Sequence, residues 1–565
     1  MVNDNAPAKK AAPTPEELAQ AAEEKERATA EGRLKDEARR TRKKIWSQSR
    51  ATVIGKVLET KARVGGSKVA FIDPEGKETT YKDVARGAFA LGNALRKRTK
   101  RGENVGVLMP TSPAGVITIL ALHIDGRVPT MINFTAGESA ILSGLETAEV
   151  KLVLTSRKFV EVGGYDDLVE AIKKKCEIAY LEDIKENLTA IDKLRAALGE
   201  KFPSFMRRPN SPDAPAVILF TSGTEGKPKG VVLSHQNLVA NVEQVRNHVI
   251  LEDTDIFINP LPIFHSYGLT GGQFYPLIDG LTCIPYPSPL HVKIIPEVIR
   301  RYGATILFAT DTFLQRYLKN AKDGALSTLR YAVCGAEKVR DETRALARKK
   351  FGFNVLEGYG ATECAPVIAV NQPGDIRPGT VGKLLPGVES RVDAVEGLSE
   401  GGRLFVRGPN VMLGYLDPDH PGELLAPDEG WHDTGDIVHI DGGGYMSIRG
   451  RQKRFAKISG EMVSLAVVEN CAGVVWPDSL HAAVILPDDK KGEQIVLLTE
   501  EPSPKPETLK DWARNHGVPE LAVPKRVLHV PDIPVLGTGK VDYVRLNAMA
   551  EDLIATAEAE KAAAE

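Results

Sequence analysis

The feature that most constrains this chain is a loop rich in glycine and lysine between two apolar runs. Residues 216–220 and 231–233 are apolar, and the ten residues between them hold three glycines, three hydroxyl side chains and two lysines. This pattern predicts a strand, a loop and a strand, with glycines that let backbone N–H groups turn toward an anion. It is not a Walker A loop, because Pro228 stands where that motif needs glycine. We expect a polyphosphate-binding loop, although an ordinary surface turn stays open for so short a segment.

Length and composition limit the class of protein. A chain of 565 residues with 42% hydrophobic and 26% charged residues is expected to form a globular protein of at least two domains. The net charge of −2 argues against a nucleic-acid partner. Five scattered cysteines without a C-x-x-C pair indicate reduced thiols in a cytoplasmic protein. No apolar run approaches the roughly 20 residues that span a bilayer, so any membrane contact would be peripheral, at its inner face.

Alternating strand and helix patterns predict an α/β fold. Short apolar runs at residues 105–109, 128–132 and 150–155 alternate with helical spacing near residues 81–95 and 114–123. Such alternation favours a largely parallel sheet. Ser234 and Asn237 are expected to cap a helix that runs to residue 249. Residues 156–212 are more polar and less regular, and are interpreted as a connection.

Later segments follow in an order that resembles a known superfamily. They are Gly335-Ala-Glu337, Glu357-Gly-Tyr-Gly-Ala-Thr-Glu363, Gly430-Trp-His-Asp-Thr-Gly-Asp436 and Pro534-Val-Leu-Gly-Thr-Gly-Lys-Val-Asp-Tyr543. With the phosphate loop, they resemble the adenylate-forming enzymes, which include acyl-CoA synthetases, luciferases and peptide-synthetase adenylation domains. The resemblance covers roughly residues 47–550. Each segment alone could be an ordinary turn, and their common order argues against that interpretation.

The resemblance assigns nucleotide-binding roles. ATP would contact Thr221, Ser222, Gly223, Thr224, Gly226, Lys229, Gly335, Ala336, Glu337, Tyr359, Gly360, Asp436 and Arg451. Within this set Tyr359 would stack on adenine, and Asp436 with Arg451 would contact the ribose. Thr362 would bond the α-phosphate and Glu363 would hold Mg²⁺, which prefers hard oxygen ligands and shares its shell with phosphates.

The resemblance also implies the domain organisation. Residues 46–452 would form a large domain of stacked mixed sheets flanked by helices, together with a small β-barrel. Residues 453–552 would form a small mobile α+β lid that turns about Lys453 and carries the catalytic Lys540. Residues 1–45 are a charged extension, helical or disordered, and residues 553–565 are a tail.

The implied reaction has two steps. A carboxylate attacks the α-phosphate of ATP to give an acyl-adenylate and pyrophosphate, with Lys540 and Thr362 near the developing charge. A phosphopantetheine thiol, on acyl carrier protein or coenzyme A, then displaces AMP. In the segment Leu261-Pro-Ile-Phe-His-Ser-Tyr-Gly268, His265 would gate the carboxylate pocket; a packed histidine is the alternative. Peptide synthetases carry an aspartate in this segment, so an amino-acid substrate is not expected.

The substrate class follows from a narrower resemblance. Asn133-Phe-Thr-Ala-Gly137, Ala309-Thr-Asp-Thr-Phe313 and Gly537-Thr-Gly-Lys-Val-Asp-Tyr543 resemble the acyl-ACP synthetase half of bifunctional 2-acylglycerophosphoethanolamine acyltransferase/acyl-ACP synthetases. This predicts a long-chain fatty acid as substrate. The acyltransferase half is not matched, and a separate lysophospholipid acyltransferase could use the product. The alternatives are a ligase for aryl or other small acids and a non-catalytic ATP-binding scaffold.

Overall fold

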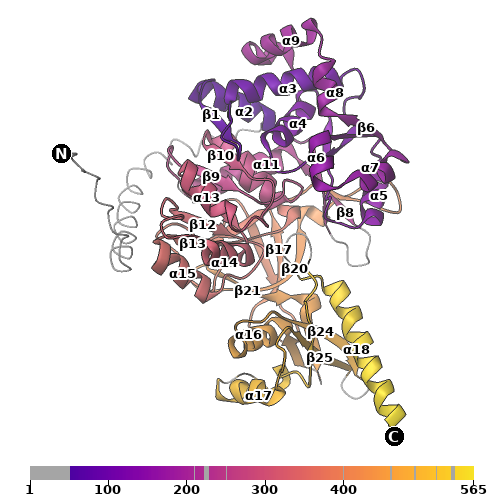
Figure 1. The fold of residues 1–565 in the computed structure, drawn as a ribbon, viewed down its shortest axis with the longest axis vertical. Coiled ribbons are helices and arrows are strands. Elements are labelled where there is room, and N and C mark those ends of the chain that lie inside the picture. Colours follow the sequence, from indigo (N-terminus) through magenta and orange to yellow (C-terminus); the bar gives the residue numbers. More distant parts are fainter. Residues whose placement is uncertain are drawn as a thin grey trace, which may run out of the picture. The chain divides into compact units, whose positions relative to one another are not determined.

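The computed structural model describes residues 51–208, 210–221, 228–249, 251–396, 398, 400–458, 461–488, 492–516, 518, 520–535 and 541–564. Their contacts divide the chain into two compact units. Unit 1 comprises the residues up to Val388 together with Gly408–Gly430, and unit 2 comprises Glu389–Arg407 and the residues from Trp431 onward. Figure 1 follows the chain through both units by colour.

A nine-stranded sheet forms one layer of unit 1. Its order is β15-β14-β13-β12-β11-β9-β10-β1-β2. The strands are β1 (Val69–Ile72), β2 (Glu78–Thr80), β9 (Ile256–Asn259), β10 (Thr282–Pro285), β11 (Ile306–Ala309), β12 (Tyr331–Cys334), β13 (Asn354–Gly360), β14 (Val367–Val370) and β15 (Lys383–Leu384). The run from β1 to β13 is parallel, and β2, β14 and β15 pair antiparallel. The carboxyl ends of β9, β11, β12 and β13 therefore meet at one edge.

An eight-stranded sheet forms the other layer. Its order is β19-β18-β8-β7-β4-β3-β5-β6. The strands are β3 (Asn104–Leu108), β4 (Val128–Met131), β5 (Leu152–Thr155), β6 (Glu177–Tyr180), β7 (Pro215–Thr221), β8 (Lys229–Ser234), β18 (Gly414–Leu416) and β19 (Leu424–Leu425). The run from β7 to β6 is parallel, whereas β8, β18 and β19 are antiparallel. The two strands predicted on either side of the phosphate loop are thus confirmed as β7 and β8.

Helices cover both sheets. They are α2 (Val53–Val64), α3 (Tyr81–Leu95), α4 (Pro113–Ile124), α5 (Glu138–Thr147), α6 (Arg157–Gly163), α7 (Asp166–Lys173), α8 (Leu181–Glu186), α9 (Ala190–Lys201), α10 (Pro203–Met206), α11 (His235–His248), α12 (Tyr275–Asp279), α13 (Ile294–Tyr302), α14 (Asp311–Asn320) and α15 (Asp341–Phe351). Shorter turns are the π-helix η1 (Tyr267–Phe274) and the 3₁₀ turns η2 (Thr362–Cys364) and η3 (Asp428–Gly430). The segment interpreted as a polar connection, residues 156–212, is instead largely helical, from α6 to α10.

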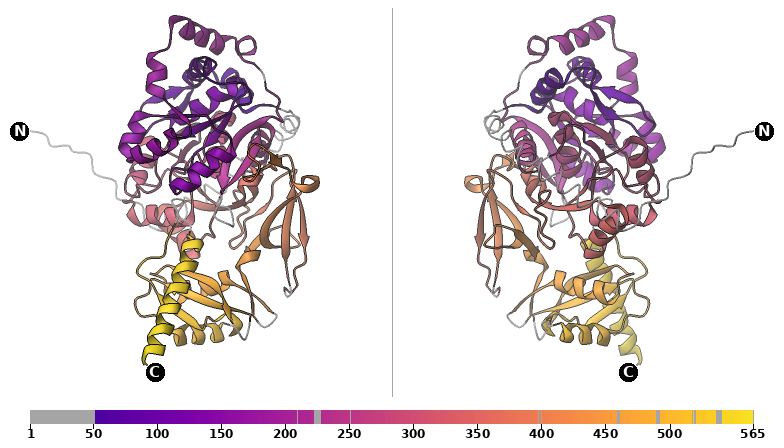
Figure 2. Two further views of the ribbon diagram at one scale, coloured as in Figure 1. Left: turned by 90° about the vertical axis from the view of Figure 1, so that its right-hand side faces the viewer. Right: turned by 90° about the vertical axis from the view of Figure 1, so that its left-hand side faces the viewer.

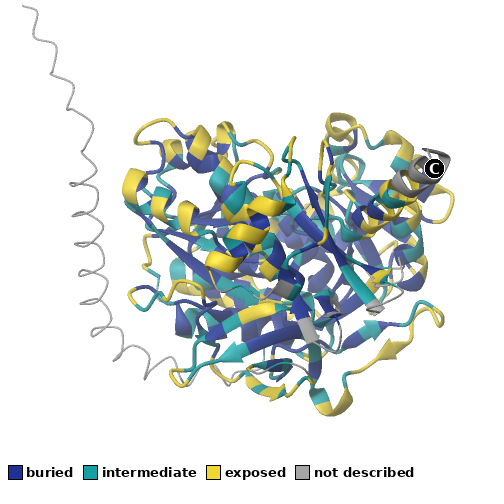
Figure 3. Ribbon diagram, turned by 90° about the horizontal axis from the view of Figure 1, so that it is seen from below, coloured by how far each residue is buried: buried dark blue, intermediate teal, exposed yellow. Residues whose placement is uncertain are grey.

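One apolar core joins the two sheets. Val107 of β3 and Leu219 of β7 belong to the same buried cluster as Ile258 of β9 and Leu307 of β11. Helix α4 is apolar on most of its surface and is buried accordingly. Figure 3 marks the buried residues in dark blue and the exposed ones in yellow. This core holds the strand ends in place.

Local capping explains where helices begin. Ser234 Oγ accepts a hydrogen bond from the Asn237 N–H at 3.0 Å, and Asn237 Oδ1 accepts one from the Ser234 N–H at 2.8 Å. This reciprocal cap satisfies two backbone donors at the start of α11 and confirms the predicted cap. Helix α11 therefore begins directly where β8 ends.

The described part of unit 2 contains three sheets and three helices, and all its strand pairs are antiparallel except β25 with β26. A four-stranded sheet has the order β16-β17-β20-β21, and the smaller sheets are β22-β23 and β24-β25-β26. The strands are β16 (Glu389–Asp393), β17 (Gly402–Arg407), β20 (His432–Ile440), β21 (Met446–Arg451), β22 (Phe455–Ile458), β23 (Glu461–Ser464), β24 (His481–Asp488), β25 (Gly492–Thr499) and β26 (Arg526–His529). The helices are α16 (Leu465–Val475), α17 (Pro506–Asn515) and α18 (Tyr543–Ala564), with short turns η4 (Gln452–Arg454) and η5 (Glu520–Ala522). Figure 2 shows these elements from two sides.

The structure bears on several expectations from the sequence. In the region where a small β-barrel is expected, Gly402–Arg407 forms β17 of a four-stranded sheet whose edge strands are β16 and β21. The contacts group that sheet with the C-terminal segments in unit 2. The domain boundary near residue 452 stays a prediction. All five cysteines are buried and none forms a disulfide, as predicted. Among the described residues, every helix is too short or too polar to cross a bilayer.

Candidate active site

The hairpin of β7 and β8 places two predicted phosphate-loop residues opposite each other. Thr221 is the last residue of β7 and Lys229 is the first of β8, and the two are partners in the sheet register. The Lys229 ammonium lies 5.1 Å from the centroid of the Tyr415 ring, a distance at which cation and ring attract each other. Ser222, Gly223, Thr224 and Gly226 lie outside the described residues.

Tyr415 connects this hairpin to the second motif. It stands on β18, which pairs with β8, and its hydroxyl donates a hydrogen bond of 2.6 Å to Glu363 Oε1. A cation, an aromatic ring and a carboxylate therefore form one continuous series from Lys229 to Glu363. The sequence assigned Tyr415 no role in the site. The pattern Leu-Gly-Tyr was its only signal, and that pattern is typical of many strand edges.

Thr362 and Glu363 lie on η2, held by backbone and side-chain bonds. The Glu363 carbonyl accepts a hydrogen bond from the Met412 N–H at 2.7 Å. The buried Asn410 side chain donates to the Cys364 carbonyl at 2.9 Å. Ser266 Oγ lies 3.4 Å from Thr362 Oγ1, within hydrogen-bond distance. The two residues predicted to contact the α-phosphate and Mg²⁺ are thus adjacent and firmly placed.

The residues around Glu363 fit a cation that takes most of its ligands from phosphate oxygens and waters rather than from the protein. Among the residues that the structure describes, no three His, Cys, Asp or Glu side chains gather into a metal site. Glu363 offers one half-buried carboxylate. Mg²⁺ commonly binds through one or two carboxylates, with phosphate oxygens and waters completing its shell. A single carboxylate beside a phosphate loop fits that chemistry.

Two asparagines of α11 fix the loops that carry these residues. Asn237 Nδ2 donates to the carbonyls of Pro409 and Val411 at 2.9 and 2.7 Å. Asn241 bonds both polar groups of the Val367 backbone, accepting from its N–H at 3.0 Å and donating to its carbonyl at 2.8 Å. Because α11 follows β8 directly, the segment that leaves the phosphate loop also positions the second motif.

Tyr359 and Gly360 end strand β13. Tyr359 is half-buried and pairs with Ala369 of β14, and Gly360 is exposed. A Cβ on Gly360 would lie 2.2 Å from the Pro366 carbonyl oxygen, so only glycine fits this approach of two strands. Their contact with adenine stays a prediction.

The turn at Gly335, Ala336 and Glu337 follows β12. Ala336 has a φ of 70°, in the left-handed region. The Glu337 carboxylate accepts a hydrogen bond of 2.9 Å from the Thr312 N–H, in the first turn of α14. The three predicted residues therefore form a tight turn at the edge where β11, β12 and β13 end.

A buried carboxylate, not assigned a role from the sequence, braces this turn. Glu357 of β13 accepts a hydrogen bond of 3.0 Å from the Val339 N–H and pairs with Arg344. Burial raises the pKa of Glu357, and its bond to Val339 and its pairing with Arg344 oppose that rise. Glu357 thus ties the backbone just beyond the turn to β13.

His265 lies between β9 and η1, beside aromatic side chains. Its ring centroid is 4.7 Å from that of Phe264, which is 4.8 Å from that of Phe134. Phe134 in turn contacts Phe159 and Tyr165, at centroid distances of 5.0 and 5.2 Å. The predicted gate residue therefore borders an apolar aromatic cluster. The π-helix η1 begins two residues later, and such helices are frequent at functional sites.

Unit 2 brings together the two predicted ribose-contacting residues. Asp436 of β20 and Arg451 of β21 are partners across the strands, and Arg451 Nε is 3.4 Å from Asp436 Oδ1. Asp436 is buried, and the Arg451 side chain is largely exposed. The Asp436 N–H donates to Thr434 Oγ1 at 3.2 Å. A fixed carboxylate beside a cation suits recognition of a diol.

The predicted hinge and catalytic lysine are only partly described. Lys453 lies in η4, and its side chain is outside the described part. Lys540 lies outside the described residues. An isolated bridge pairs Val535 with Val541, and the Asp542 N–H donates to the Pro534 carbonyl at 2.8 Å. The two ends of the segment that holds Lys540 are therefore joined at its base.

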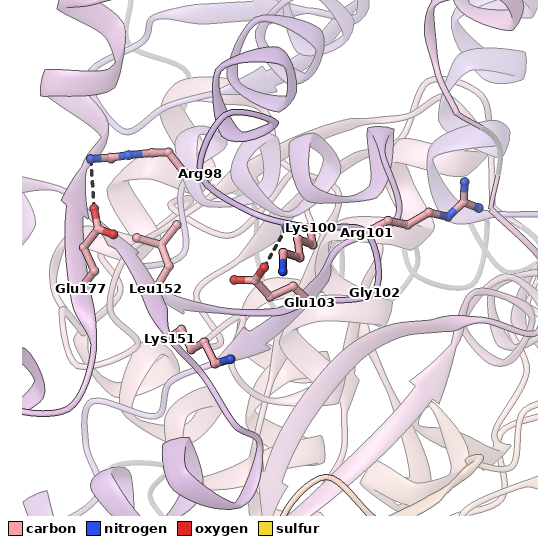
Figure 4. Close-up of a pocket in the computed structure, with 8 residues that line it drawn as sticks. All are labelled: Arg98, Lys100, Arg101, Gly102, Glu103, Lys151, Leu152 and Glu177. Atoms are coloured by element: carbon pink, nitrogen blue, oxygen red, sulfur yellow. Dashed lines mark hydrogen bonds and ion pairs between the residues drawn. The ribbon is translucent and has the colours of Figure 1, made fainter.

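A surface pocket in unit 1 is separate from these residues. Figure 4 shows its lining, which includes Arg98, Glu103, Lys151 and Glu177. Arg98 pairs with Glu177 at 3.0 Å. The pocket lies at the amino ends of the parallel strands β3, β5 and β6, and the predicted phosphate-loop residue Thr221 follows a carboxyl end. In sheets of this kind ligands bind at the carboxyl ends.

Comparison with known proteins places this geometry in a family. A family model described as AMP-binding enzyme matches residues 58–416. The chain is 26% identical over 508 residues to the medium-chain fatty-acid–CoA ligase of Escherichia coli (strain K12), covering 85% of this chain and 87% of that protein. It is 28% identical over 477 residues to the probable 4-coumarate–CoA ligase 3 of Dictyostelium discoideum, covering 78% of this chain and 85% of that protein.

Solved structures show the same architecture. ATP-bound MatB from Rhodopseudomonas palustris matches with a TM-score of 0.74 and 26% identity, over 88% of this chain and 99% of that one. The Bacillus subtilis o-succinylbenzoate coenzyme A synthetase with ATP and magnesium matches with a TM-score of 0.73 and 21% identity, over 86% of this chain and 98% of that one. At that identity the match shows similarity of fold alone. The predicted α/β fold class is confirmed. The family model spans more than half of this chain, so the chain belongs to the AMP-binding enzyme family.

Proposed function

We propose that this protein activates a long-chain fatty acid with ATP as an acyl-adenylate and transfers the acyl group to a phosphopantetheine thiol. The observation that carries the proposal is the series Lys229, Tyr415 and Glu363, which joins the phosphate-loop hairpin to the predicted magnesium motif. The pairing of Asp436 with Arg451 in unit 2 supports it, because both are predicted ribose contacts.

The first step forms the adenylate. A carboxylate oxygen of the fatty acid attacks the α-phosphorus of ATP, and the bond to the leaving pyrophosphate breaks. Lys229 and the loop would hold the terminal phosphates, while Thr362 and Lys540 would stabilise charge at the α-phosphate. Bound Mg²⁺ would neutralise charge on the phosphate oxygens, with Glu363 as its protein ligand.

The second step forms the thioester. The thiol sulfur attacks the acyl carbon, the bond between that carbon and the phosphate oxygen breaks, and AMP leaves. The lid would turn about Lys453 to admit the thiol. The chain's own cysteines are all buried, and burial raises the pKa of the Cys364 thiol beside Glu363. An external thiol is therefore the nucleophile that this proposal needs, and the unpaired cysteines suit a cytoplasmic enzyme.

The substrate proposal rests on the region around His265. The aromatic cluster of Phe134, Phe159, Tyr165 and Phe264 offers an apolar surface beside the predicted gate. Similarity to a medium-chain fatty-acid–CoA ligase agrees with an acyl chain. Similarity to a 4-coumarate–CoA ligase favours the alternative, an aryl acid with coenzyme A. The subgroup resemblance favours acyl carrier protein as acceptor, and the names of the relatives favour coenzyme A.

A single assay separates these outcomes. The purified protein is given ATP and Mg²⁺ with palmitate or 4-coumarate, and with coenzyme A or holo acyl carrier protein, and thioesters are measured by mass spectrometry. We expect palmitoyl thioester on the carrier protein. Product with 4-coumarate and coenzyme A alone would establish the alternative, and no acid-dependent AMP with either acid would contradict both.

Two variants test the assigned roles. Lys540→Ala is expected to lower acid-dependent pyrophosphate exchange by on the order of a hundredfold while ATP still binds, since it removes one charge-stabilising group. The exposed Lys525→Ala in the same unit is its control. Lys453→Pro is expected to slow thioester formation more than adenylation, and equal loss of both steps would contradict a hinge.

A further inference from the structure

Helices α9 and α10 present a stripe of exposed apolar side chains. Their exposed fractions are 62% for Ile191, 60% for Leu194, 39% for Leu198, 55% for Phe202 and 89% for Phe205. Within α9 the spacing of three and four residues puts Ile191, Leu194 and Leu198 on one side of the helix. Phe202, at φ −126° and ψ 60°, ends α9, and Phe205 lies in the short α10 that follows. Single exposed apolar residues are ordinary, but a contiguous apolar surface marks an interaction site.

The opposite side of α9 is anchored, which fixes the direction of the stripe. Helix α9 packs on α3, as Figures 1 and 2 show. A Cβ on Gly199 would lie 2.5 Å from the Phe89 ring, so the two helices approach closely. Asp192 pairs with Lys97 at 3.3 Å, near one end of α9. With that side held, the stripe faces away from the core.

In these helices the acidic side chains are buried and most of the basic side chains are exposed. Between residues 190 and 208 the acidic residues are Asp192 and Glu200, both buried and paired toward the core. Four cations of this segment are exposed, and within the described residues none has an ion pair: Lys193, Arg195, Lys201 and Arg208. At about 100° per residue, Arg195 and Lys201 flank the stripe on opposite sides. The exposed surface is therefore apolar in the middle and cationic at its rim.

We propose that the α9–α10 stripe docks on an anionic lipid bilayer. Leu194, Leu198 and Phe205 would enter the boundary between headgroups and acyl chains, and Arg195 and Lys201 would lie at the anionic headgroups. A second copy of this chain fits less well, because a two-fold contact would place cationic rims against each other. The proposal is independent of the proposed function, since it rests on the stripe and its rim alone.

The test uses the full chain and vesicles of defined composition. Flotation is measured with phosphatidylcholine vesicles containing one quarter phosphatidylglycerol and with phosphatidylcholine alone. We expect binding to the anionic vesicles that weakens with salt. Leu194→Gln with Phe205→Ser is expected to lower the partition coefficient at least about tenfold, because buried apolar area is lost. Leu290→Gln is the matched control, at 61% exposure elsewhere in unit 1.

A charge variant tests the rim separately. Arg195→Gln with Lys201→Gln is expected to remove the preference for anionic vesicles. The proposal is overturned if the wild type fails to float with anionic vesicles, or if the stripe variant floats as the wild type does. In the second case the basic segment Arg39-Arg-Thr-Arg-Lys-Lys44 would be the contact. A wild-type dimer that the stripe variant converts to monomer would assign the stripe to self-association instead.

Discussion

The guanidinium carbon of Arg454 lies 3.7 Å from the centroid of the Tyr543 ring, and both side chains bond to Glu469. The Arg454 to Glu469 contact is 2.6 Å, and the Tyr543 hydroxyl donates to Glu469 at 3.2 Å. Burial beside Glu469 raises the pKa of Tyr543. Arg454 follows the predicted hinge Lys453, and Tyr543 begins the helix after the predicted catalytic Lys540. This contact therefore joins the two segments on which the proposed mechanism depends.

Removal of the Tyr543 ring is expected to destabilise unit 2. Tyr543→Ala should lower its free energy of unfolding by about 2–3 kcal/mol, through lost packing and the lost ring–cation contact. Tyr543→Phe keeps the ring and should cost about 1 kcal/mol, for one hydrogen bond. Tryptophan fluorescence during urea unfolding reports on this unit, which holds Trp431, Trp476 and Trp512. Equal stability of the alanine variant and the wild type would contradict the assignment.

The Tyr415 hydroxyl is expected to matter for adenylation rather than for folding. Tyr415→Phe keeps the ring against Lys229 and removes the bond to Glu363, so the carboxylate loses an orienting donor. We expect acid-dependent pyrophosphate exchange to fall by about tenfold, the lower end of effects from misplaced catalytic groups. Tyr286→Phe, which removes a 2.9 Å bond to His291, is the control. Similar small losses in both variants would count against a role for Tyr415 in the site.

Asn241 is expected to be required for the stability of unit 1. Asn241→Leu removes the acceptor of the half-buried Val367 N–H and the 2.8 Å donor to the Val367 carbonyl, which keeps a longer contact of 3.4 Å with Asn410 Nδ2. One unsatisfied group costs about 1–3 kcal/mol, so a loss of about 1–3 kcal/mol is expected. The midpoint of urea unfolding measures it, with the exposed Asn187→Ala as control. A midpoint equal to that of the wild type would mean that the loop is held by other contacts.

A buried histidine pair is expected to make unit 1 sensitive to acid. The rings of His123 and His235 are 4.6 Å apart, and His123 Nε2 donates to the Ala216 carbonyl at 2.7 Å. Burial lowers the pKa of His123 from 6.5 to about 4, and burial beside His123 and Arg207 lowers that of His235. Both rings are therefore neutral when folded. The unfolded chain binds more protons below pH 6.5. The contribution of the two neutral histidines to the free energy of unfolding is therefore fully present above that pH, and it is lost as the pH drops toward 4.

The slope of that loss can be measured. Each histidine contributes up to about 1.4 kcal/mol per pH unit, so the pair contributes up to about 2.7 kcal/mol per unit. Urea midpoints are compared between pH 7.5 and pH 5. His123→Gln should roughly halve the change attributable to the pair, whereas the exposed His516→Gln should leave it unaltered. An unchanged slope in the His123 variant would show that other groups govern the acid response.

The sequence by itself determined the order of elements and the motifs. Apolar periodicity and glycine turns predicted β7, β8 and α11, because these are local properties of neighbouring residues. The resemblance assigned Asp436 and Arg451 to the same ribose, and in the structure they are partners across two strands. Strands joined by a short turn tend to pair, so this contact also depends on nearby sequence.

Only the tertiary structure decided which distant side chains meet. Tyr415 reaches Glu363 because β18 pairs with β8, a contact between strands nearly two hundred residues apart. In α9 the periodic Ile191, Leu194 and Leu198 would suggest a buried face, yet the fold buries Asp192 and Glu200 instead. Lys61 of α2 and Lys97, just beyond the end of α3, neutralise those carboxylates. Helical period indicates that a helix has two faces, and the charges of its neighbours decide which face is covered.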